Sequence, residues 1–136
     1  MDLEIRWDDQ QPGVIIMQYG QVATWDELFE FFETQGNMAA QVSHPVAVIV
    51  LRQEAIHLPG GDWMAAAQHI RRSQPPNVKV WIGVGLNRTV QAVVEVARRA
   101  GIINAYNAAS IEAAREIAAT ALAEVEADAS HQPQHT

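Results

Sequence analysis

The polar residues best placed to do chemistry fall in two short stretches, each directly after a β-like run. The first, residues 52–63, reads RQEAIHLPGGDW, and the second, residues 83–88, reads GVGLNR. In open α/β sheets, ligands bind at the carboxyl ends of the parallel strands, where both stretches are expected to lie. The candidate partner or ligand surface comprises Arg52, Glu54, His57, Gly60, Asp62, Trp63, Asn87 and Arg88.

Within the first stretch, Glu54, His57 and Asp62 could form an acid–base cluster. A histidine beside carboxylates is a common general acid–base arrangement. Three such residues in one surface loop also arise easily by chance, and no Ser–His–Asp triad accompanies them. An enzyme using this cluster is therefore an alternative, and the sequence assigns no catalytic residue.

The spacing of the remaining candidates argues against a cofactor or a metal. GVGLNR begins like a dinucleotide fingerprint, but Arg88 occupies the third glycine position. The PGG turn lacks the lysine of a phosphate-binding loop, and the chain has no cysteine for thiolate ligation. No histidine pair at i, i+4 lies on a predicted helix, so neither a cofactor nor a metal site is expected.

The composition and charge of the chain limit the kinds of partner that it is expected to bind. The 136 residues fit one domain, and the net charge of −7 comes with scattered basic residues. The doublets Arg71-Arg72 and Arg98-Arg99 fall in last turns of predicted helices, where the helix dipole favours cations. Nucleic acid is not expected. The first residues lack a secretory signal and the apolar runs are too short for a membrane span, so a cytoplasmic protein is expected.

Hydrophobic periodicity predicts the element order β-β-α-β-α-β-α-β-α. The expected strands are residues 3–7, 14–19, 45–52, 78–85 and 102–106, and the expected helices are residues 24–35, 63–73, 88–100 and 111–126. Strands alternating with helices imply right-handed parallel crossovers. The prediction is an α/β domain over residues 1–127, with a mixed, mostly parallel sheet of about five strands and four helices; residues 128–136 are expected to be a disordered tail.

Several side chains define the predicted elements. Thr24 and Glu27 have capping-box spacing before the first helix, and Asn87 and Ser110 are expected to cap the third and fourth. The apolar stripe of the first helix is Trp25, Leu28, Phe29 and Phe32. Trp81 shares a strand face with small or polar neighbours; burial is the favoured prediction, whereas exposure would indicate a docking surface or a homodimer.

The closing segments VARRAGI, INAY and SIEAA, with the opening PGVIIMQYGQVATWDEL, resemble the STAS domain. This is the fold of bacterial anti-sigma-factor antagonists and of the cytoplasmic ends of sulfate transporters. The resemblance covers about residues 3–126. It implies a non-enzymatic signalling or protein-interaction module, with a regulatory kinase or an anti-sigma factor as the kind of partner.

The chain departs from that family at its regulatory position. STAS antagonists carry a phosphorylatable Ser or Thr where the loop after the third strand meets the second helix. Here the matching run is LPGGDW, and Gly60 stands about where the hydroxyl belongs. Arg52 stands near the place of the usual acidic residue. The usual phospho-switch is thus expected to be missing, with Asp62 a fixed negative charge at the helix start.

Three hypotheses remain open. The first is a STAS-like interaction module that is not phospho-switched at the usual site. The second is a small-molecule or lipid-binding module with a pocket beneath residues 52–63, at the carboxyl ends of the parallel strands. The third is the enzyme using His57 with Glu54 or Asp62.

Overall fold

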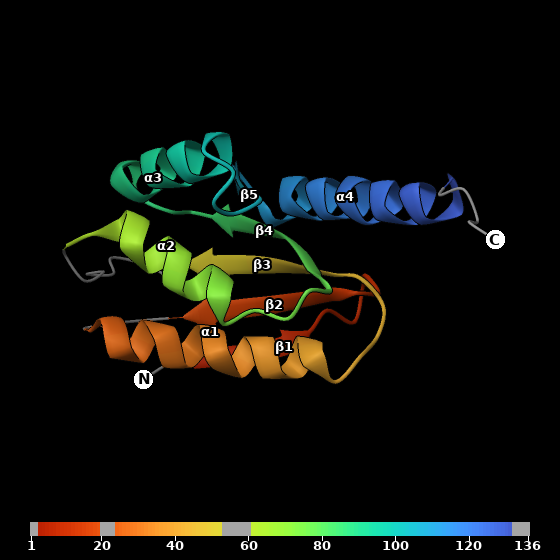
Figure 1. The fold of residues 1–136 in the computed structure, drawn as a ribbon, viewed down its shortest axis with the longest axis horizontal. Coiled ribbons are helices and arrows are strands. Elements are labelled where there is room, and N and C mark those ends of the chain that lie inside the picture. The colour runs from red at the N-terminus through yellow and green to blue at the C-terminus, as the bar shows by residue number, and fades with distance from the viewer. Residues whose placement is uncertain (1–2, 20–23, 53–60, 132–136) are drawn as a thin grey trace.

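A computed structural model describes residues 3–19, 24–52 and 61–131, and its elements follow the predicted order (Figure 1). The strands are β1 (Leu3–Trp7), β2 (Val14–Tyr19), β3 (Val46–Arg52), β4 (Val78–Val84) and β5 (Ala105–Ala108). The helices are α1 (Trp25–Ala40), α2 (Trp63–Arg72), α3 (Arg88–Arg99) and α4 (Ile111–His131).

The five strands form one mixed sheet in the order β1-β2-β3-β4-β5. β1 and β2 are antiparallel, and the other neighbouring pairs are parallel. The α/β fold class, with a mostly parallel sheet and four helices, is therefore confirmed. β3 is buried from Val46 to Val50, as expected for an apolar central strand covered on both faces.

The chain crosses the sheet in one direction, which decides where the helices lie. Right-handed crossovers that always move to the next strand place their helices on the same face. α1, α2 and α3 accordingly share one face, where they pack on residues such as Ile15, Val48 and Trp81. α4 covers the other face alone, packing Ala114 and Ala118 over the central strands.

The predicted helix caps are confirmed by hydrogen bonds. The Thr24 hydroxyl oxygen accepts from the Glu27 amide at 3.2 Å, and the Asn87 side-chain oxygen accepts from the Val90 amide at 2.9 Å. The Ser110 hydroxyl oxygen accepts from the Ala113 amide at 3.1 Å. Each cap satisfies an amide that the first helical turn leaves without an intrahelical partner.

The largest differences from the predicted bounds are found in three elements. α1 continues to Ala40, and its buried face includes Phe31, which the predicted stripe missed. β5 begins at Ala105 because the Ile102 amide still bonds the Ala97 carbonyl, closing the end of α3 at 2.9 Å. α4 extends to His131, so the first residues of the expected tail are helical, and residues 132–136 lie outside the described residues.

A buried ion pair joins the β1–β2 hairpin to α4. The Asp8 side chain is fully buried, and Arg115 donates from Nε to Oδ2 at 3.0 Å and from a terminal nitrogen to Oδ1 at 3.3 Å. The Gln10 amide also bonds Asp8 Oδ1 at 3.0 Å, and the Gln11 side chain bonds the Arg115 carbonyl at 3.0 Å. The pair therefore fixes one end of the sheet to its lone covering helix.

Removing one member of this pair should destabilise the fold. Asp8→Asn keeps the bond from the Gln10 amide but leaves Arg115 without its carboxylate, and we expect a loss of roughly 2–4 kcal/mol in the free energy of unfolding. The double variant Asp8→Asn/Arg115→Met should lose less than the sum of the two single variants in urea titrations. Additive losses would contradict a direct coupling.

Gln35 is a polar residue buried in the face of α1. Its side chain has no solvent exposure, and within the described structure neither the amide oxygen nor the nitrogen has a hydrogen-bond partner. Gln35→Met keeps the approximate shape and removes both unpaired groups, so we expect the free energy of unfolding to rise by about 1–2 kcal/mol. A destabilised variant in urea titrations would show that the amide is hydrogen-bonded in solution.

Candidate functional site

The structure leaves half of the predicted surface undescribed. Glu54, His57 and Gly60 lie outside the described residues, as does the side chain of Arg52 at the end of β3. The predicted acid–base cluster and the position of the missing hydroxyl therefore remain predictions. The other four residues, Asp62, Trp63, Asn87 and Arg88, can be placed.

Asp62 and Asn87 both act as helix caps. The Asp62 carboxylate oxygen accepts from the Ala65 amide at 3.0 Å at the start of α2, and Asn87 does the same for α3. Asp62 is exposed, so its charge faces solvent beside the positive end of the helix dipole. Arg88, the first residue of α3, is also exposed, and only Trp63 turns toward the interior.

Trp63 is held in an aromatic contact between α2 and α1. Its ring meets Trp25 edge-on, with ring centroids 4.7 Å apart, and Trp25 in turn stacks on Phe29 at 5.9 Å. Phe29 contacts His69 of α2 with centroids 4.0 Å apart. These contacts hold α2 against α1 and orient Trp63 along the edge of a cavity.

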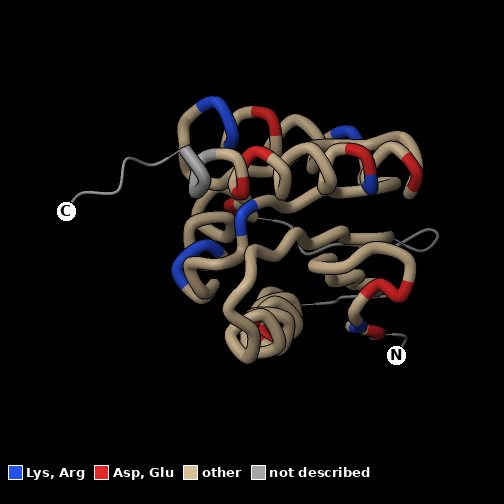
Figure 2. The backbone as a smooth tube through the Cα atoms, turned by 90° about the vertical axis from the view of Figure 1, so that its right-hand side faces the viewer, with Lys and Arg blue, Asp and Glu red and all other residues tan. Residues whose placement is uncertain are grey.

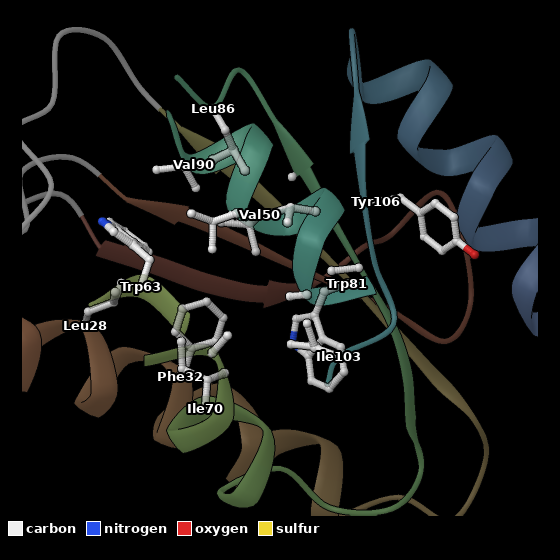
Figure 3. A pocket seen from close by; sticks show the side chains of 16 residues that line it. Leu28, Phe32, Val50, Trp63, Ile70, Trp81, Leu86, Val90, Ile103 and Tyr106 are labelled. Atoms are coloured by element: carbon white, nitrogen blue, oxygen red, sulfur yellow. The ribbon is translucent and has the colours of Figure 1, made fainter. Parts of the chain in front are cut away.

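An apolar cavity of about 110 Å³ lies between the sheet and the helices of its three-helix face (Figure 3). Its floor comes from β3, β4 and β5, and its walls come from α1, α2 and α3. The lining residues are Leu28, Phe32, Val50, Trp63, Ala67, Ile70, Trp81, Gly83, Leu86, Val90, Val93, Val94, Ala97, Ile103, Ala105 and Tyr106. In Figure 3, Leu86 and Val90 lie at one end, and Ile70 and Ile103 lie toward the other.

Small residues leave this space open. Gly83 of β4 lines the cavity but does not enlarge it, because Leu86 folds back over the strand and fills the space that a side chain at Gly83 would need. Ala67 on α2 and Ala97 on α3 have no side chain long enough to reach across. Both helices therefore contribute a small side chain to the cavity wall.

The residues that line the cavity carry few polar side-chain atoms. Among its lining residues only the tryptophans and Tyr106 carry polar side-chain atoms, and none is an acid or a base that titrates near neutral pH. The Trp81 indole nitrogen is buried without a hydrogen-bond partner among the described residues. Burial of Trp81, at 8% exposure, confirms the favoured prediction and removes it as an argument for a docking surface or a homodimer.

The predicted pocket beneath residues 52–63 and this cavity share only part of their walls. Trp63 was named as a candidate and residues 83–88 as a candidate stretch, whereas no residue within α3 beyond Arg88 was named. The cavity is lined from α3 by one apolar stripe, which consists of Val90, Val93, Val94 and Ala97. The signal that could have marked the cavity is the combination of that stripe with Gly83 on the facing strand.

The described parts of the chain give little support for a metal site or a membrane-spanning helix. In residues 3–19, 24–52 and 61–131, no three His, Asp or Glu side chains gather closely enough to hold a metal ion. No helix described there is both long and apolar enough to cross a bilayer. In Figure 2 the Lys and Arg positions of the described residues occur at several separate places along the backbone.

Comparison with known proteins adds no relative. Models of protein families, curated proteins and solved structures were all compared with the chain, and none of the three comparisons found a match.

The cap at the start of α2 can be tested directly. Asp62→Ala should lower the free energy of unfolding by about 1 kcal/mol because the Ala65 amide loses its acceptor. Asp62→Asn keeps an acceptor oxygen and should stay close to the parent protein in urea titrations. Equal losses in the two variants would show that the charge, and not the hydrogen bond, stabilises the helix.

Proposed function

We propose that the chain is a non-enzymatic module that binds a small apolar molecule in the cavity between the sheet, α2 and α3. The observation that carries the proposal is an apolar cavity with Trp63, Trp81 and Leu86 in its walls. Ligand sites are commonly concave, largely apolar and lined by aromatic side chains. This develops the small-molecule alternative of the sequence analysis.

The size of the cavity limits the ligand. Apolar cavities of about 150 Å³ stay dry and take up benzene. At about 110 Å³, this partly open cavity can enclose only a segment of an aliphatic chain, and the rest of a longer ligand would lie outside it. A ligand placed there would exchange an unfilled apolar space for dispersion contacts, without displacing hydrogen-bonded water.

The surroundings of the cavity favour binding over catalysis. General acid–base chemistry needs a titratable group within hydrogen-bond reach of the substrate. None of the lining residues supplies one near neutral pH. The third hypothesis, an enzyme using His57 with Glu54 or Asp62, depends on residues outside the described part, apart from Asp62, which caps α2.

A STAS-like interaction module in the cytoplasm is the second candidate. It is favoured by the element order and by the exposed Asp62 carboxylate at the start of α2, beside the position that corresponds in sequence to the phosphorylated hydroxyl of STAS antagonists. The partner would be an anti-sigma factor or a regulatory kinase. Asp62→Asn keeps the cap and removes the charge, so it should weaken binding to such a partner in a pull-down if the fixed charge is recognised.

Filling the cavity should abolish binding of an apolar probe. 1-Octanol below its solubility limit should raise the melting temperature of the parent protein, because a ligand that binds only the folded state stabilises it. Ala67→Phe projects a ring from α2 into the cavity and should remove that rise. Differential scanning calorimetry at several octanol concentrations measures the melting temperatures of the parent protein and of the variant.

The matched control is Ala92→Phe, which adds the same ring on the exposed side of α3, away from the cavity. The control variant should show the same octanol-induced rise in melting temperature as the parent protein. If octanol stabilises none of the proteins, or stabilises Ala67→Phe as much as the parent, the cavity is not the binding site and the proposal fails.

A further inference from the structure

A second depression adjoins the apolar cavity at the amino-terminal ends of β4 and β5. This basin has a volume of about 520 Å³ and is lined by residues from the end of α2, the start of β4 and the loop before β5. Its cationic members are Arg71, Arg72 and Lys79. Trp81 and Ile103 line both the basin and the cavity, so the two spaces meet at these side chains.

The three basin cations are free of ion pairs in the described structure. The ion pairs found there use the other basic residues Arg6, Arg98, Arg99 and Arg115. Lys79 donates one hydrogen bond to the Pro76 carbonyl at 2.8 Å, which leaves two of its three N–H donors. No acidic residue lines the basin.

This concentration of positive charge contrasts with the chain as a whole, which carries a net charge of −7. The carboxyl end of α2 contributes about half a negative charge from the helix dipole, which partly offsets the two arginines. Three formal positive charges still exceed that contribution. The basin is therefore a local positive site that borders an apolar space.

We propose that the ligand of the cavity is an amphiphile with an anionic head. The head would lie in the basin near Arg71, Arg72 and Lys79, and the aliphatic chain would pass Trp81 and Ile103 into the cavity. This inference rests on the proposed function, because it needs the apolar cavity to accept the chain. A carboxylate head matches the guanidinium groups, which can bind it with paired N–H donors.

The test compares octanoate with 1-octanol at pH 7, both below micellar concentrations, by isothermal titration calorimetry. The double variant Arg71→Gln/Lys79→Gln removes two of the three basin charges. Each lost contact should weaken octanoate binding about threefold, giving roughly tenfold for the pair, while octanol binding stays unchanged. Raising the salt concentration should weaken octanoate binding to the parent protein and leave octanol unaffected.

The matched control is Arg6→Glu, which lowers the net charge by the same two units on β1, at the opposite edge of the sheet from the basin. It should bind octanoate like the parent protein. If the control weakens octanoate binding as much as the basin variant does, only net charge matters and the inference is wrong.

Two further outcomes separate this inference from the proposed function. If octanol binds and Ala67→Phe abolishes that binding, but octanoate affinity is unchanged in the basin variant, the apolar site stands and the anionic head is refuted. If neither probe binds the parent protein, the proposed function and the inference both fail.

Discussion

The direction in which the chain crosses its sheet is the constraint on which the rest of this structure depends. Each parallel crossover is right-handed and leads to the adjacent strand, so α1, α2 and α3 must share one face. The remaining helix, α4, has to cover the other face by itself. This arrangement places α2 and α3 over β4, where the apolar cavity lies.

The two faces of the sheet differ in how their side chains are packed and paired. The face under α4 is closed by apolar packing and fixed by the buried Asp8–Arg115 pair. The three-helix face carries unfilled space and buried polar atoms without partners, including those of Gln35 and Trp81. Incomplete packing and unpaired donors both lower stability. The proposed binding site thus lies on the face that holds these unfilled and unpaired groups.

Local signals in the sequence were enough for the fold but not for the site. The apolar run of β3 and the caps at Thr24, Asn87 and Ser110 depend on neighbouring residues, and all were predicted. The cavity depends on side chains from six elements, which no spacing along the chain reveals. Arg71 and Arg72 were explained as cations at a helix end, and only the fold brings Lys79 beside them.

Methyl NMR with 1-octanol as the probe tests the central claim most directly, since it reports where the molecule binds. The account predicts saturable shifts at the methyl groups of Leu86, Val90 and Val93 around the cavity, while Leu122 of α4 stays unchanged. Shifts confined to the exposed Val96 or spread evenly over both faces of the sheet would contradict a specific apolar site.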